Sequence, residues 1–61
     1  MEKGAIVDVY PEGSPAYRGC VLEAKNKVGL VYVVNLNNGA RGYEDHSEIV
    51  PTTITSIFIV E

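Results

Sequence analysis

The sequence is poor in the residues from which small domains usually gain extra stability. Its 61 residues include one cysteine, one histidine and no tryptophan. A single cysteine excludes an intrachain disulfide, and so few Cys and His residues exclude a structural zinc site. A chain of this length buries only about 60% of the surface that its unfolded form exposes. We therefore predict one domain, residues 1–61, that is marginally stable unless it packs against a further surface.

Long apolar runs and an excess of positive charge are lacking as well. No apolar run approaches the roughly 20 residues that span a bilayer, and the N-terminal residues show no signal-peptide pattern. We therefore expect a cytoplasmic protein without membrane attachment. The net charge is −3. This balance disfavours non-specific binding to nucleic acid, which needs a basic stripe on the protein surface.

Strand-forming sequence, in contrast, is abundant. Hydrophobic residues make up 46% of the chain, and no apolar pattern of helical period lasts for two turns. Residues 28–37 read as a central strand that ends at Asn38-Gly39, a dipeptide typical of two-residue type I′ hairpin turns. Such a turn would set Tyr43 opposite Val34. Alternation along this strand predicts one uniformly apolar face that belongs to the core: Val28, Leu30, Tyr32, Val34 and Leu36.

Four further stretches complete the predicted sheet. Residues 5–10 and 17–24 read as strands, residues 40–44 as the return strand of the hairpin, and residues 49–51 as a short strand after a 3₁₀ turn at 45–48. In the first strand, Ala5, Val7 and Val9 are predicted to face the core. Gly19 indicates a bulge or a sharp bend. Residues 11–16 form a proline-containing loop that is long for a hairpin connection.

Residues 52–60 form an uncharged, β-branched segment without proline. An exposed strand edge of this composition promotes aggregation, so a soluble protein has to cover it. The segment carries apolar side chains on both alternating faces, which is more than one small barrel can bury. We therefore expect a homo-oligomer, most simply a two-fold dimer. The expected interface residues are Ile54, Ile57, Phe58 and Ile59.

The order of these elements resembles the Src-homology-3-like small barrel, the fold that Tudor and KOW domains share. The resemblance rests on Lys3-Gly4-x-x-Val7-x-Val9, on Tyr17-Arg18-Gly19-x-Val21, and on residues 33–39 and 48–51. It implies an all-β barrel of five or six strands. The chain differs from KOW domains in its acidity, and from peptide-binding barrels in its lack of tryptophan.

Residues able to carry catalysis or bind a metal are few. A Cys/His enzyme would need Cys20 and His46 in contact, together with an orienting third group, and a cysteine within a strand is more often a small core residue. The spacing of the acidic residues around His46 matches no calcium or zinc motif. We therefore expect no enzymatic activity, no cofactor and no metal.

The remaining candidates point to binding. We expect a non-enzymatic interaction module, of a kind found in phages, plasmids and bacteria, that binds a protein partner, assembles with itself, or does both. The expected partner-binding residues lie on and beside the first loop: Tyr10, Glu12, Tyr17 and Arg18. The alternative is a KOW-like barrel that binds nucleic acid through Arg18, Lys25, Lys27 and Arg41. An enzyme whose sites form between the subunits of an oligomer is a third reading, for which the sequence offers no residue set.

Overall fold

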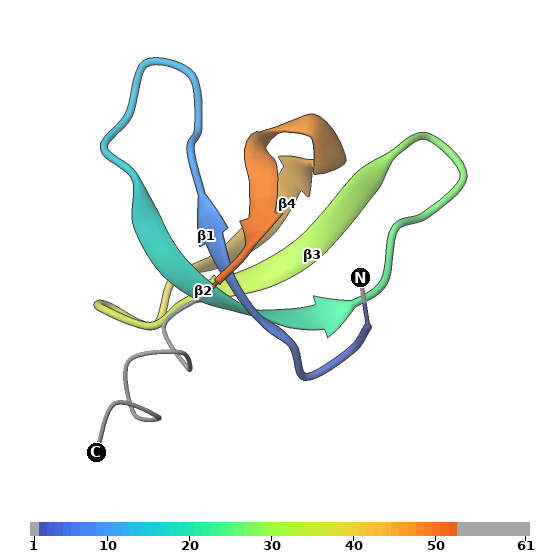
Figure 1. The fold of residues 1–61 in the computed structure, drawn as a ribbon, viewed down its shortest axis with the longest axis horizontal. Coiled ribbons are helices and arrows are strands. Elements are labelled where there is room, and N and C mark those ends of the chain that lie inside the picture. Colours follow the sequence, from blue (N-terminus) through green and yellow to red (C-terminus); the bar gives the residue numbers. More distant parts are fainter. Residues whose placement is uncertain (1, 53–61) are drawn as a thin grey trace.

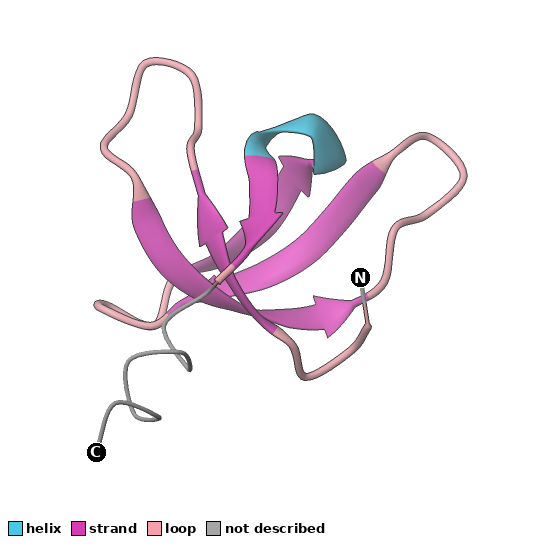
Figure 2. Ribbon diagram, in the orientation of Figure 1, coloured by secondary structure: helices cyan, strands magenta, loops and turns pink. Residues whose placement is uncertain are grey.

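A computed structural model describes residues 2–52 of the chain as one antiparallel β-sheet (Figures 1 and 2). The elements follow the chain as β1 (Ile6–Val9), β2 (Tyr17–Glu23), β3 (Leu30–Asn35), β4 (Arg41–Asp45), the 3₁₀ helix η1 (His46–Glu48) and β5 (Ile49–Pro51). The prediction of an all-β domain with a 3₁₀ turn before a short strand at residues 49–51 is confirmed.

The strands lie in the order β4-β3-β2-β1-β5. Within residues 2–52 the edge strands β4 and β5 do not pair with each other, so the sheet is open and the predicted closed barrel is not confirmed. Only the three residues of η1 join these two edges, and Figure 1 shows how strongly the sheet curves between them.

Six aliphatic side chains form the core on the concave side of the sheet, which we call the inner face. They are Val7, Val9, Val21, Val31, Val33 and Ile49, each at most 5% exposed. The predicted orientation of β1 is confirmed, because Val7 and Val9 are buried and Ala5 packs against the core. Five of the six are valines, so the core is small, and each side chain contributes about 1.5–3 kcal/mol when fully buried.

The predicted orientation of β3 is wrong. Val31 and Val33 are buried, whereas Val28 is 76% exposed and Leu36 is 51% exposed, and both of these lie beyond the ends of the strand. Tyr32 lies on the convex side, which we call the outer face. Both alternating sets of this stretch are apolar, so the choice of face depends on the neighbouring strands. Val31 and Val33 are the pair that meets the inner residues of β2 and β4.

The connection from β3 to β4 also differs from the predicted two-residue turn. Asn38 has a negative φ and Gly39 has a φ of 77°, so a type I′ turn is excluded. The connection is a five-residue loop, residues 36–40, in which the Gly39 amide donates to the Asn35 carbonyl over 2.8 Å. The hairpin register consequently shifts by two residues. Tyr43 pairs with Tyr32 on the outer face, not with Val34, and is 56% exposed.

Gly19 is regularly paired with Val7 on β1 and Asn35 on β3, and the irregularity of β2 comes later, between Val21 and Glu23. The predicted bulge at Gly19 is therefore wrong in position. Gly19 is buried, and a Cβ atom there would lie 3.0 Å from the Val34 carbonyl oxygen and 3.3 Å from the Tyr17 ring. The glycine is needed because another strand and a tyrosine ring approach its backbone closely.

The predicted oligomer residues Ile54, Ile57, Phe58 and Ile59 lie outside the described residues. None of the helices within residues 2–52 has the length or the apolar character needed to cross a membrane.

Candidate protein-binding site

Two loops meet at one end of the sheet. The first loop, residues 10–16, connects β1 to β2, and the loop of residues 36–40 connects β3 to β4. A hydrogen bond of 2.9 Å from the Leu36 amide to the Arg18 carbonyl holds the second loop beside the start of β2. The Tyr10 amide donates to the Glu48 carbonyl over 2.8 Å, which ties the first loop to η1. This end of the sheet therefore brings together three segments that are distant in sequence.

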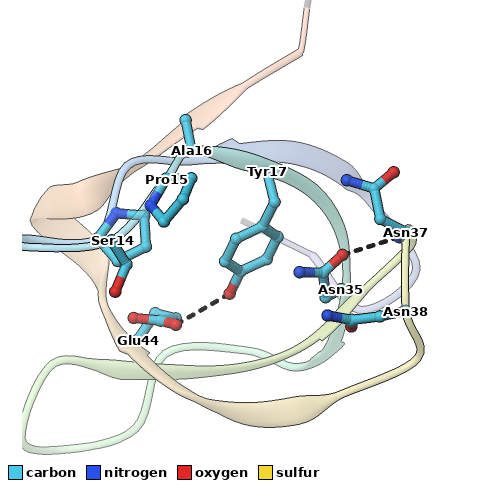
Figure 3. Close-up of a pocket in the computed structure, with 9 residues that line it drawn as sticks. Ser14, Pro15, Ala16, Tyr17, Asn35, Asn37, Asn38 and Glu44 are labelled. Carbon is cyan, nitrogen blue, oxygen red and sulfur yellow. Dashed lines mark hydrogen bonds between the residues drawn. The ribbon is translucent and has the colours of Figure 1, made fainter.

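A hollow of about 360 Å³ opens between these loops (Figure 3). Its lining comes from the first loop, the second loop and the inner faces of β2, β3 and β4: Pro11, Ser14, Pro15, Ala16, Tyr17, Asn35, Asn37, Asn38 and Glu44. The hollow lies on the inner face, just beyond the last core valines, where polar side chains replace aliphatic ones. The hollow is therefore an opening at the end of the hydrophobic core.

Tyr17 is the central side chain of this hollow. It is half-buried, packs against the core, and shares the inner face of β2 with Gly19 and Val21. Its hydroxyl donates a hydrogen bond of 2.9 Å to Oε2 of Glu44 on β4, across the width of the sheet (Figure 3). Burial, this hydrogen bond, and the charges of Glu44 and Glu48 raise the pKa of Tyr17 to about 12. The phenol therefore acts at neutral pH as a donor held in one orientation.

Three asparagines shape the opposite wall. Oδ1 of Asn35 accepts from the Asn37 amide over 2.7 Å, and Oδ1 of Asn38 accepts from the Ala40 amide over 2.9 Å. These side chains take over hydrogen bonds that a tight turn would make with its backbone. Figure 3 shows Asn35 and Asn38 on the same side of the hollow, facing Tyr17 and Glu44. The loop therefore presents amide groups to whatever occupies the space.

A second hollow, of about 310 Å³, lies next to the first and shares Ala16, Tyr17 and Asn37 with it. Its other lining residues are Asp8, Tyr10 and Arg18. Nε of Arg18 lies 3.1 Å from Oδ1 of Asp8, and both side chains are partly exposed. An exposed pair of this kind contributes little to stability, about 0–1 kcal/mol. The guanidinium is thus positioned by the ion pair and remains accessible.

The sequence-predicted binding residues are distributed as follows. Tyr10, Tyr17 and Arg18 all line the second hollow, and Tyr17 also lines the first. Tyr10 is 56% exposed. Glu12 is exposed on the first loop and belongs to the lining of neither hollow. The structure thus brings three of the four residues together at one surface.

Sequence reasoning missed the asparagines, and it grouped Glu44 with the acidic residues around His46, not with Tyr17. Glu44 lies 27 positions from Tyr17 in the chain, and the pairing of β4 with β3 brings it to the inner face. No short motif encodes such a distance. The three asparagines between residues 35 and 38 did carry a signal, because asparagine side chains commonly replace backbone partners in loops. The sequence prediction assigns them to a strand and a two-residue turn.

The four basic residues of the alternative reading do not gather at one place. Arg18 is the second residue of β2, and Arg41 is the first residue of β4 at the same end of the sheet. Lys25 and Lys27 lie in the loop after β2, at the opposite end of that strand. The structure thus divides these cations between two ends of the sheet.

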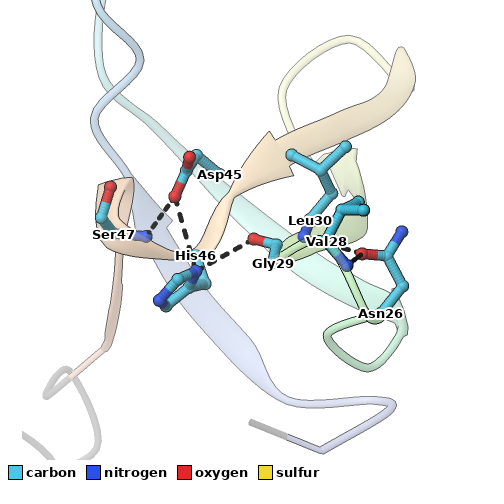
Figure 4. Close-up of polar contacts among 7 residues, drawn as sticks. All are labelled: Asn26, Val28, Gly29, Leu30, Asp45, His46 and Ser47. Carbon is cyan, nitrogen blue, oxygen red and sulfur yellow. Dashed lines mark hydrogen bonds and ion pairs between the residues drawn. The ribbon is translucent and has the colours of Figure 1, made fainter.

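Cys20 and His46 occupy different parts of the fold. Cys20 lies within β2, where Ile6 and Val34 are its neighbours on the adjacent strands. His46 opens η1, and Nδ1 of its ring lies 3.0 Å from the Gly29 carbonyl oxygen (Figure 4). Gly29 has a φ of 90° and no side chain to obstruct this ring. His46 thereby fastens the loop between β2 and β3 to η1.

The acidic residues near His46 have separate roles. Glu44 turns inward to Tyr17, whereas Asp45 caps η1 by accepting from the Ser47 amide over 2.9 Å. This hydrogen bonding to Ser47, with a smaller effect of His46, lowers the pKa of Asp45. Within residues 2–52, no three His, Cys, Asp or Glu side chains gather in a way that could hold a metal ion.

Comparison of the chain with protein-family models, curated proteins and solved structures finds no significant match.

Proposed function

We propose that this protein is an interaction module that binds an extended segment of a protein partner in the two hollows beneath the first loop. The observation that carries the proposal is that the hollows adjoin at Tyr17, and together form one surface from Tyr10 to Glu44. A surface with two adjoining depressions suits a chain that places successive side chains at regular intervals.

The open shape of the hollows supports a peptide as the ligand. Sites for small molecules and cofactors have volumes of about 300–1,000 Å³ and enclose most of the ligand surface. The hollows, of about 360 Å³ and 310 Å³, lie at the lower end of that range and open to solvent at the end of the sheet. Each suits one or two side chains of a longer ligand.

The chemistry of the lining supports the same ligand class. Proline and tyrosine rings provide rigid apolar contacts that cost little conformational entropy on binding. The asparagine amides can pair with the backbone groups of an extended peptide, as chain-to-chain hydrogen bonds do in other peptide complexes. Glu44 supplies a carboxylate for a basic or hydrogen-bond-donating side chain of the partner.

We further propose that the fold is of the Src-homology-3-like small-barrel class. The long first loop, the β3–β4 hairpin and the three-residue η1 before β5 follow the order of elements on which the sequence resemblance rests. The strand order, with the two edges only η1 apart, supports a curved sheet whose seam runs between β4 and β5. Function does not follow from such a fold, so the binding proposal depends on the hollows alone.

A library of random peptides displayed on phage, selected against the immobilised full chain, tests the proposal. We expect enriched peptides with micromolar affinity, weakened about tenfold or more by Tyr10→Ala, since aromatic anchors dominate such interfaces. The matched control is Tyr43→Ala, because Tyr43 is equally exposed at 56% but lies on the outer face.

Two results would overturn the proposal. One is that no peptide is enriched while DNA- or RNA-coated resin retains the protein in a salt-dependent manner, which would favour the nucleic-acid alternative. The other is that Tyr43→Ala and Tyr10→Ala weaken peptide binding equally, which would place binding on another surface.

A further inference from the structure

The outer face of the sheet carries an apolar strip whose residues line neither hollow of the proposed binding site. Ile6, Cys20 and Val34 are direct neighbours across β1, β2 and β3. The rings of Tyr32 and Tyr43 extend the strip over β4, with their centroids 4.8 Å apart. The face is only partly covered by its own packing, because Ile6 is 40% exposed and Tyr43 is 56% exposed.

Charged side chains border this strip. The Asp8–Arg18 ion pair lies on one side of the strip. Glu23 on β2 is paired with Tyr32, and Arg41 on β4 is paired with Val34. An apolar centre with a polar rim is the usual organisation of a surface that another element covers. The inner core, with six buried side chains, is also small for a chain of this apolar content. A second apolar layer on the outer face would compensate for it.

We infer that residues 53–61 of the same chain dock onto this outer face. The described chain delivers the segment to the edge of the strip: the Thr52 amide donates to the Ile6 carbonyl over 3.4 Å. Since Val50 is opposite Asp8 on the outer face, alternation along β5 places Thr52 on that face too. The segment therefore begins beside Ile6, the first residue of the strip.

The segment has the composition that the strip requires. Five of its nine residues are large and apolar, namely Ile54, Ile57, Phe58, Ile59 and Val60. It carries no charge before Glu61. The segment is thus a ready source of side chains that could cover Ile6, Val34 and the tyrosine pair.

Its length also matches. Nine extended residues reach about 30 Å, while the distance from β1 to β4 is three strand spacings, or roughly 14 Å. An extended segment can therefore cross the whole strip.

The area of the strip favours this segment over a second copy of the protein. Four strands at the usual spacing, each about four residues long beneath the strip, offer a surface on the order of 250 Å². A stable complex of two proteins buries about 800 Å² on each partner. A tethered segment needs no such area, because its effective concentration at the strip is in the millimolar range. Docking within one chain is therefore the arrangement that the dimensions support.

The rate at which a maleimide reagent labels Cys20 tests the inference. Cys20 is the chain's single cysteine and lies half-buried in the middle of the strip, so a docked segment would shield its thiol. We expect the double variant Ile57→Asp/Phe58→Asp to be labelled about tenfold faster than the wild type, since opening of the segment would no longer be needed. The control Thr53→Asp/Thr55→Asp adds the same charge to the same segment but keeps its apolar side chains. It should be labelled as slowly as the wild type.

The dependence of Cys20 labelling on protein concentration distinguishes a segment of the same chain from a second copy of the protein. A segment docked within its own chain protects Cys20 equally at low and high micromolar concentration. Protection that appears only at high concentration would mean that a second copy covers the face, and equal labelling of all three proteins would mean that nothing covers it. Either result overturns the inference.

A second measurement stands even if the double variant fails to fold. At low concentration, nuclear Overhauser contacts of the wild-type protein should connect the Phe58 or Ile57 side chain with Val34, Ile6 or Tyr32. Their absence, in spectra that resolve contacts among the inner valines, would overturn the inference.

Discussion

The close packing around Gly19 leads to a prediction whose sign is opposite to the usual one. Replacing glycine by alanine at a compatible strand position stabilises a protein by about 0.4–1 kcal/mol, because the unfolded chain loses freedom. At Gly19, however, the new Cβ atom would lie 3.0 Å from the Val34 carbonyl oxygen and 3.3 Å from the Tyr17 ring. The carbonyl belongs to the neighbouring strand and cannot move cheaply.

The expected magnitude follows from these two opposing effects. Overpacking a well-fitted site costs typically about 1–3 kcal/mol, which exceeds the gain from the unfolded state. We therefore expect Gly19→Ala to lower the free energy of unfolding by about 1–2 kcal/mol. That is a large fraction of the stability of so small a domain. Displacement of the Tyr17 ring should also weaken its hydrogen bond to Glu44.

Gly42 provides the matched control. It lies in β4, has no positive φ, and its Cβ atom would meet no heavy atom within 4 Å. Gly42→Ala should therefore raise the free energy of unfolding by about 0.5 kcal/mol. Urea unfolding of both variants, followed by circular dichroism, measures the difference. If Gly19→Ala were as stabilising as Gly42→Ala, the described packing of Tyr17 and Val34 around Gly19 would be wrong.

Two further predictions concern the same end of the sheet. The pKa of Tyr17 is about 12 in the folded chain against an ordinary value of 10.0, so the unfolded chain loses the phenol proton first, and stability should fall as the pH rises from 10 to 12. Because the ring is partly exposed, we expect the free energy of unfolding to fall by about 1 kcal/mol, less than the full pKa shift would give. Urea unfolding of the wild type between pH 10 and 12 should show this loss. A Tyr17→Phe variant that lost the same amount of stability would refute the raised pKa of Tyr17. Gly39 has a φ of 77°, so Gly39→Val should lower the free energy of unfolding by about 1 kcal/mol or more. The neighbouring Ala40→Val should lower it less. Equal melting temperatures for the two variants would contradict the positive φ at Gly39.

The strands themselves could be predicted from the sequence, because each stands between turn signals. Val7 and Val9 were placed in the core correctly, since Asp8 between them has to face outward. Residues 28–36 offered no such marker, and two apolar faces competed. The register with β2 and β4 decided in favour of Val31 and Val33, and register is a property of strand pairs that one strand does not reveal.

The candidate site was predictable only where it is local. Tyr10, Tyr17 and Arg18 flank an unusually long loop, and binding residues often lie on or beside such loops. Glu44 joins the site through two strand pairings, and Asn35 belongs to it because the β3–β4 loop is longer than the Asn-Gly dipeptide suggested. The positions of Glu44 and Asn35 both depend on the register between β3 and β4. The five-residue loop shifts this register by two positions relative to a two-residue turn.

Chemical-shift mapping with an enriched peptide is the most direct test of binding beneath the first loop. The ¹⁵N-labelled full chain would be titrated with the peptide, and the backbone amides that shift would be identified. We expect the shifts to cluster at residues 10–18 and 35–38 and at Glu44, with little change at Cys20 or Lys25. Shifts centred on the outer face, or on the loop that carries Lys25, would contradict it.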